Sequence, residues 1–188
     1  MWFVESAAGK IGRISPEGRI AEYVVGDAGD EPTAIITGPD NALWFTEVGT
    51  GRLGRMNASG HISHFAAGHG RLTGDITTDF SGSLWFGKKS SVARMSTGGK
   101  LTEYSLPSGI VDTGAIFGSK SGGVYMGAIK SDGTGAIVGV SETGATKEYD
   151  LPQKNRFPIE MALDPDGWFF MTVTTPDGKP VPVVYSLK

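Results

Sequence analysis

Residues 39–47 read Pro-Asp-Asn-Ala-Leu-Trp-Phe-Thr-Glu, and this pattern recurs along the whole chain. Its Asp-Asn pair is typical of a tight turn, and the apolar, aromatic run that follows is typical of a buried strand. The central aromatic position recurs as Trp2, Trp44, Trp85, Tyr125 and Phe170, at spacings of 42, 41, 40 and 45 residues. A repeat of about 40–50 residues that carries four strands is typical of a propeller blade.

The repeat divides residues 1–188, which we treat as a single domain, into three complete units and two partial ones. The complete units are residues 32–72, 73–112 and 113–158, and each contains four apolar or alternating strand patterns. The partial units, residues 1–31 and 159–188, contain three each. We therefore expect an all-β propeller of four-stranded antiparallel blades with about 4.5 repeats. Such an arc leaves blade edges open, so either a shortened larger ring, self-association or pairing of the two ends is expected.

Composition excludes several classes of function. The chain has 17 basic and 20 acidic residues, for a net charge of −3, and no cluster of Lys or Arg, which argues against nucleic-acid binding. It has no cysteine, hence no disulfide and no thiolate site. No apolar run approaches the length of a membrane span. The first residues lack the pattern of a secretory signal, which slightly favours the cytoplasm.

Three motifs carry a family resemblance: residues 43–47 (Leu-Trp-Phe-Thr-Glu), 51–56 (Gly-Arg-Leu-Gly-Arg-Met) and 99–107 (Gly-Lys-Leu-Thr-Glu-Tyr-Ser-Leu-Pro). Together the repeats resemble the streptogramin B lyase family, also called virginiamycin B lyases, over essentially all 188 residues. The resemblance implies an incomplete seven-bladed ring. It also implies a bacterial, Mg²⁺-dependent carbon–oxygen lyase of antibiotic resistance, which linearises a cyclic depsipeptide by elimination at its ester bond. In that family, histidines at one mouth of the central channel include the general base, and two glutamates hold the metal.

The chain departs from this family pattern at the histidines. Their place in successive units is filled by Thr33, Thr73, Thr113 and Ile159. Threonine has no pKa near neutrality and is a poor general base, which argues against lyase catalysis. The family's two metal-binding glutamates are both kept only at the start of the unit 32–72, as Glu31 and Glu47. Carboxylates are the oxygen ligands that Mg²⁺ prefers. The alternative is that Glu47 ends a strand and Glu31 lies in a solvated loop.

The remaining candidates are polar residues at the starts of inner strands, where a propeller opens its channel. We expect a site for a small molecule or peptide there, formed by Thr33, His69, Arg71, Thr73, Asp112 and Thr113. His61, His64 and His69 fall within nine residues, but the repeat places the first two on an outer strand, which argues against a shared zinc ion.

Two functional hypotheses follow from the sequence. The first is a lyase that acts on a cyclic peptide antibiotic, as the resemblance implies. The second is a non-catalytic propeller that binds a ligand at its channel mouth or serves as a platform for protein interactions. A fold hosts many functions, so only the residues of the site can decide between them.

Overall fold

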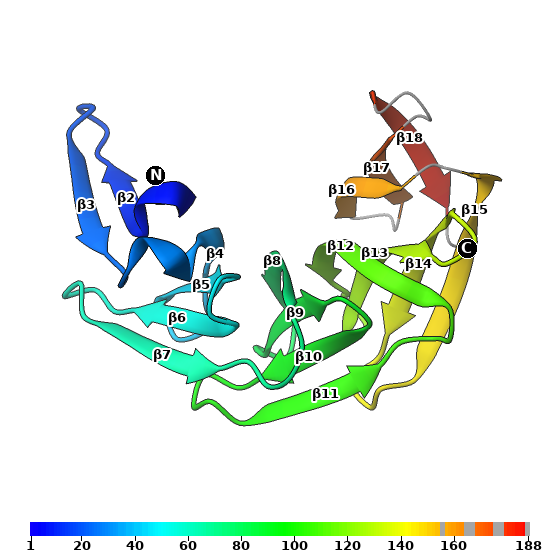
Figure 1. Cartoon of the computed structure of the whole chain (residues 1–188), viewed down its shortest axis with the longest axis horizontal. Helices are drawn as coiled ribbons and strands as arrows, with labels where there is room; N and C mark the ends of the chain where they lie inside the picture. Colours follow the sequence, from blue (N-terminus) through cyan, green and yellow to red (C-terminus); the bar gives the residue numbers. More distant parts are fainter. Residues whose placement is uncertain (155–156, 164–167, 175–178, 187–188) are drawn as a thin grey trace.

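The computed structural model describes residues 1–154, 157–163, 168–174 and 179–186. Five small antiparallel sheets follow one another along the chain and are arranged in an open arc around a common centre (Figure 1). The N-terminal and C-terminal sheets lie at the two ends of this arc. Within the described part of the chain, no helix has the length and apolarity to cross a membrane.

The strands of each sheet are consecutive in sequence. The first sheet contains β1 (Trp2–Glu5), β2 (Lys10–Ile14) and β3 (Ile20–Val24). The second contains β4 (Pro32–Thr37), β5 (Leu43–Glu47), β6 (Arg52–Met56) and β7 (Ile62–Ala66). The third contains β8 (Leu72–Thr78), β9 (Leu84–Lys88), β10 (Ser91–Met95) and β11 (Leu101–Ser105). The fourth contains β12 (Ile110–Gly118), β13 (Val124–Lys130), β14 (Thr134–Val140) and β15 (Thr146–Lys154).

The fifth sheet contains β16 (Pro158–Leu163), β17 (Trp168–Thr174) and β18 (Pro180–Ser186). Two short 3₁₀ turns, η1 (Ser6–Ala8) and η2 (Ala28–Asp30), lie beside the first two sheets. The sheets are therefore those of a propeller, with three four-stranded blades between two three-stranded ones. The strands β8 and β16 begin one residue, and β12 begins three residues, before the unit boundaries that the repeat suggests.

The first strand of each four-stranded sheet lies at the hub and the fourth at the rim (Figure 1). Neighbouring inner strands pack against one another, β4 against β8 and β8 against β12. Polar groups join them as well: the Asp75 carboxylate on β8 accepts a hydrogen bond from the Ile116 amide on β12, at 2.8 Å. The inner strands thus form one continuous wall, and their ends are brought together at the hub.

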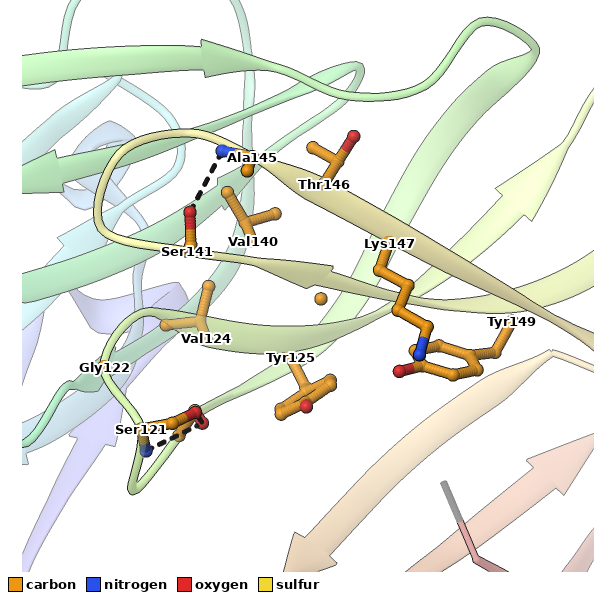
Figure 2. A pocket seen from close by; sticks show the side chains of 12 residues that line it. Ser121, Gly122, Val124, Tyr125, Val140, Ser141, Ala145, Thr146, Lys147 and Tyr149 are labelled. Atoms are coloured by element: carbon orange, nitrogen blue, oxygen red, sulfur yellow. Dashed lines mark hydrogen bonds between the residues drawn. The ribbon is translucent and has the colours of Figure 1, made fainter. Parts of the chain in front are cut away.

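The repeated aromatic residues pack between sheets. Trp44 and Trp85 have no exposed surface, whereas Trp2 in the first sheet is half-buried. Each of these three tryptophans also contacts an aromatic ring of its own rim strand, as Trp85 does with Tyr104 at 5.6 Å between ring centroids. In the fourth sheet Tyr125 takes the tryptophan place (Figure 2). For the fifth repeat, Phe170 lies on β17 opposite Val184, and its side chain falls outside the described residues.

Each buried tryptophan also belongs to a polar triad. The Trp44 Nε1–H donates to Asp40 at 2.9 Å, and Arg55 Nε donates to the other carboxylate oxygen at 2.7 Å. The Arg55 guanidinium stacks on the same indole, with Cζ 5.9 Å from the ring centroid. Burying an indole N–H without an acceptor is unfavourable, so the carboxylate allows the ring to be fully buried.

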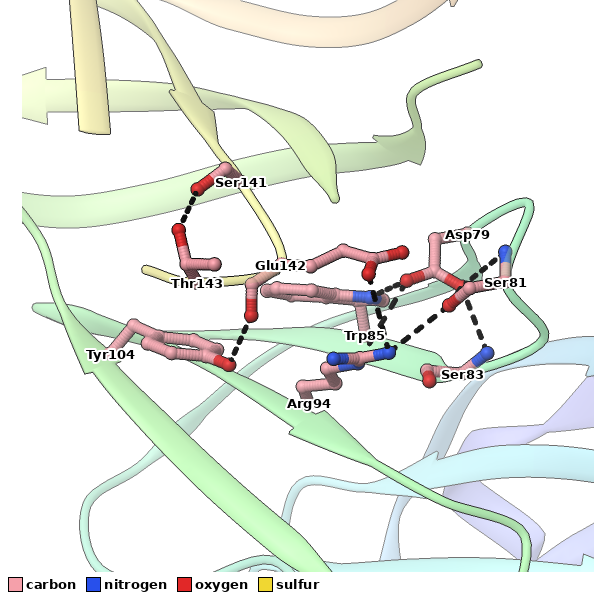
Figure 3. Close-up of polar contacts among 9 residues, drawn as sticks. All are labelled: Asp79, Ser81, Ser83, Trp85, Arg94, Tyr104, Ser141, Glu142 and Thr143. Carbon is pink, nitrogen blue, oxygen red and sulfur yellow. Dashed lines mark hydrogen bonds and ion pairs between the residues drawn. The ribbon is translucent and has the colours of Figure 1, made fainter. Parts of the chain in front are cut away.

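The third sheet repeats this triad. The Trp85 Nε1–H donates to Asp79 at 2.7 Å, and the Arg94 Nε lies 3.9 Å from the same carboxylate oxygen (Figure 3). Burial raises the pKa of Asp79, but hydrogen bonds from Ser83, Ser81 and Trp85 outweigh it and hold that pKa below its usual value. The ionised Asp79 carboxylate therefore stabilises the fold at pH values above the ordinary pKa of an aspartate. This stabilisation is lost as the pH falls through the lowered pKa that Asp79 has in the folded protein.

We expect Trp44→Ala to lower the free energy of unfolding by about 3–5 kcal/mol, because it removes a fully buried side chain and leaves Asp40 without its indole donor. Chemical denaturation followed by circular dichroism measures this change. Trp2→Ala serves as the comparison, with an expected loss of about 1–2 kcal/mol at the half-buried position. A loss below about 1 kcal/mol for Trp44→Ala would show that this ring does not anchor the core.

Candidate functional site

A cavity of about 330 Å³ lies at the hub, where the starts of three inner strands meet the ends of their neighbours. The second, third and fourth sheets all contribute to its walls. The residues that line it are Glu31, Thr33, Val48, Arg71, Leu72, Thr73, Gly74, Lys89, Asp112 and Thr113. Five of the six residues expected at the channel mouth are therefore brought together, along with Glu31.

The three threonines occupy equivalent positions in successive sheets and line the cavity together. The hydroxyls of Thr73 and Thr113 are 3.0 Å apart and share a hydrogen bond. The Thr113 hydroxyl also lies 3.0 Å from the Lys88 carbonyl oxygen, to which it donates. On β4, the Thr33 hydroxyl donates to the Glu31 carbonyl at 3.0 Å. Each hydroxyl is thus held in a fixed network, and none has an adjacent base that would activate it.

Four charged residues surround these hydroxyls, two acidic and two basic. Glu31 has a positive φ of 48°, an uncommon conformation for a residue with a side chain, and its carbonyl accepts a hydrogen bond from Val48 at the end of β5. Arg71 and Lys89 face one another across the equivalent backbone pair of the third sheet, where the Lys89 amide donates to the Arg71 carbonyl at 3.2 Å. Asp112 lies on β12 and accepts from the Thr113 amide. The cavity is therefore polar with balanced charge.

Asp75 lies two residues beyond Thr73 on the same inner strand. Desolvation by burial raises the pKa of its carboxyl group above the ordinary value, and the two hydrogen bonds that it accepts, from the amides of Ile76 and Ile116, oppose this shift only partly. No cation is paired with it in the described part of the chain. Its role in the structure is to join β8 to β12 beneath the cavity.

Glu47 lies outside the cavity, although Pro32 pairs with it across β4 and β5. Its side chain has no exposed surface. One carboxylate oxygen contacts His64 Nδ1 at 2.8 Å, and the other accepts from Arg52 Nε at 2.9 Å. The carboxylate lies over Gly54 and is directed toward the rim strand rather than toward the hub.

This arrangement tests the expected magnesium pair. Mg²⁺ requires accessible oxygen ligands in an octahedron and usually keeps several waters. Both oxygens of Glu47 are already engaged, one by His64 and the other by Arg52, which also binds Asp30 at 2.9 Å. Glu47 and Glu31 therefore do not fit a shared magnesium ion in this structure. Among the residues described, no group of three or more His, Asp or Glu is arranged to hold a metal.

The third sheet carries the same ion pair with the charges exchanged. Lys88 takes the place of Glu47, is fully buried, and donates to Glu103 on the rim strand and to the His69 carbonyl. A buried ion pair between the second and fourth strands is thus a property of the blade rather than of a metal site. Sequence inspection does not reveal this, because the partners are about 15 residues apart and lie on different strands.

The histidines do not converge. His64 lies on β7 and contacts Glu47, while His69 lies in the loop before β8. His69 is exposed and is not among the residues that line the cavity, and its carbonyl accepts a hydrogen bond from Lys88. Conversely, Lys89 and Val48 line the cavity but were not predicted. Their repeat position could have identified them in the sequence, because each lies one residue after the end of the second strand of its unit.

The comparisons with known proteins agree with this fold. Residues 1–73 match the model of the Virginiamycin B lyase family. A streptogramin B lyase structure is 26% identical and superposes with a TM-score of 0.83 over all of this chain and 65% of its own. The chain is a virginiamycin B lyase-like propeller.

Two further structures support the same architecture. One is a catalytically inactive histidine-to-alanine variant of virginiamycin B lyase from Staphylococcus aureus with quinupristin, at 24% identity and a TM-score of 0.84 over all of this chain and 66% of that one. The other is a gluconolactonase from Xanthomonas campestris, at 14% identity and a TM-score of 0.65 over 99% of this chain and 72% of that one. No curated protein matches the sequence significantly. The chain spans 65–66% of the length of the lyase structures, and at these identities the likeness concerns the fold.

Proposed function

We propose that this virginiamycin B lyase-like propeller binds a small zwitterionic or peptide-like ligand in the cavity at its hub, without catalysing its cleavage. The observation that carries the proposal is the composition of that cavity, in which three threonines stand at the repeat position of the family's histidines between two acidic and two basic side chains. The acidic residues come from the second and fourth sheets and the basic ones from the third sheet between them, and such neighbouring opposite charges suit a ligand that carries both an amine and a carboxylate, or several peptide groups.

The same residues argue against general-base chemistry. Elimination at an ester requires a base near the proton that it removes, with a pKa near the working pH. None of the residues that line the cavity is a histidine, and the threonine hydroxyls bond to each other and to carbonyls. Glu31 and Asp112 remain as acceptors, which suits recognition of an amine or amide N–H.

A second candidate is lyase activity on a streptogramin B antibiotic. It is favoured by the match of residues 1–73 to the family model and by the superposition on streptogramin B lyase. Magnesium would be the cofactor that polarises the ester in such a reaction. This candidate requires a base and a metal arrangement different from those of the cavity described here.

Calorimetric titration with quinupristin, followed by mass spectrometry of the same mixture with and without Mg²⁺, distinguishes the two candidates. We expect saturable binding, no linear product in either mixture, and at least a tenfold weaker affinity for Arg71→Gln and Asp112→Asn. Arg19→Gln, an exposed turn residue far from the hub in sequence and structure, is the matched control and should bind as the parent does. Product that requires Mg²⁺ would establish the lyase, and the absence of binding would refute both candidates for this ligand.

We also propose that the arc is part of a seven-bladed ring, as the family resemblance implies. Support comes from the first sheet, where the ring of Phe3 lies over Gly12 as Phe45 lies over Gly54. Phe45 is fully buried against the first sheet, whereas Phe3 faces the open end of the arc and is only half-buried. An apolar sheet face of this kind is suited to cover by another blade.

Because this face is open, we expect the 188-residue chain to self-associate in solution. Light scattering after size exclusion, at about 100 μM, should give a molar mass above the 19.7 kDa of one chain. Phe3→Lys places a charge on the open face and should shift the mass toward that of one chain. A single 19.7 kDa species for the parent protein at this concentration would contradict the expectation.

A further inference from the structure

A second hollow, of about 210 Å³, lies on the fourth sheet, away from the hub cavity (Figure 2). Its walls come from β13, β14 and β15 and from the two turns that join β12 to β13 and β14 to β15. The residues that line it are Ser119, Ser121, Gly122, Val124, Tyr125, Gly139, Val140, Ser141, Ala145, Thr146, Lys147 and Tyr149. None of them lines the hub cavity.

The backbone around this hollow matches that of the third sheet. Tyr125 pairs with Gly139 across β13 and β14, as Trp85 pairs with Arg94 across β9 and β10. The turns also correspond, since the Ser119 amide donates to the Gly123 carbonyl at 2.9 Å and the Asp79 amide to the Ser83 carbonyl at 3.0 Å. The same frame therefore carries different side chains in the two sheets.

All three members of the triad are replaced by smaller residues in the fourth sheet. Tyr125 stands for tryptophan, Ser119 for aspartate, and Gly139 for arginine. The Tyr125 ring lies directly over Gly139, where a Cβ atom would come within 2.9 Å of it. Figure 3 shows the polar network around Trp85, and Figure 2 shows Tyr125 and Lys147 among the residues that line the hollow. The Tyr125 ring thus covers the place of the arginine Cβ atom, and the hollow lies beside this ring, with Ser119 at the place of the carboxylate.

The polar groups of the hollow favour a particular ligand. Among the described residues that line it, Lys147 alone is charged, and its ammonium lies 4.8 Å from the centroid of the Tyr149 ring. The interaction with Tyr149 raises the pKa of Lys147 above its ordinary value, and like any lysine near that value it is charged at neutral pH. The serines are engaged locally: the Ser119 and Ser121 hydroxyls are 2.8 Å apart, and Ser141 accepts from the Ala145 amide. Lys147 therefore provides the main charge for recognition.

We propose that this hollow binds a small ring-bearing carboxylate, with the ring packed beside Tyr125 and the carboxylate paired with Lys147. An aromatic or saturated ring buried against a tyrosine gains apolar contact, and the ammonium of Lys147 supplies a charge-assisted hydrogen bond. A cationic ligand is disfavoured, because the triad's carboxylate is replaced here by Ser119 and the lysine would repel it.

Benzoate is a suitable probe, and benzamide is its uncharged counterpart of the same shape. Titration of each into the isotope-labelled protein, followed by NMR shifts of the amides on β13–β15, reports binding at this hollow rather than at the hub. We expect benzoate to bind at least tenfold more tightly than benzamide. Lys147→Gln should abolish this preference, whereas Lys100→Gln, which changes an exposed lysine just before β11, should retain it.

Gly139→Arg is an independent test, because its long side chain would move the Tyr125 ring, which lies 2.9 Å from the added Cβ atom, and would extend into the hollow beside it. This variant should fold with an unchanged circular dichroism spectrum and should lose benzoate binding at least tenfold. The proposal is overturned if benzoate shifts no amides of β13–β15, if benzamide binds equally well, or if Lys147→Gln binds benzoate as the parent does.

Discussion

The structure depends on one repeated interaction, in which an indole N–H and a guanidinium share a single carboxylate between neighbouring sheets. In the second and third sheets the carboxylates are Asp40 and Asp79, and both tryptophans are fully buried. The carboxylate satisfies the indole N–H, so a large aromatic ring can fill the space between sheets without leaving a buried polar group unpaired. The ring then fixes the spacing of the sheets, and this spacing brings the inner strands together at the hub.

The backbone of the blades is the same from sheet to sheet, whereas the residues at the strand ends differ. The inner strands place one threonine from each of three sheets around the hub cavity, while the residues beside them supply two negative and two positive charges. The second strands end in a buried charged residue that contacts the rim strand, Glu47 with His64 and Lys88 with Glu103. Function in such a fold is decided by these few positions, which is why a lyase-like scaffold is compatible with a binding role.

The sequence predicted the sheets well because spacing and alternation are local signals, and five repeats of an aromatic strand reinforce each other. It also predicted that Arg71 and Asp112 lie at the channel mouth, and both line the hub cavity. It did not predict the direction of the Glu47 side chain, since that depends on Arg52 and His64, residues on two other strands whose pairing no short motif encodes. It placed His69 in a loop at the channel mouth, whereas the structure leaves His69 exposed and outside the lining of the cavity.

Exchange of the indole N–H protons with deuterium, followed by NMR with assignment by substitution, tests the central claim most directly. Exchange requires the donor to separate from its acceptor, so it reports whether the carboxylate holds the indole between sheets. The account predicts slow exchange for Trp44 and Trp85 and fast exchange for the half-buried Trp2. Fast exchange of Trp44 and Trp85, at the rate of Trp2, would contradict it.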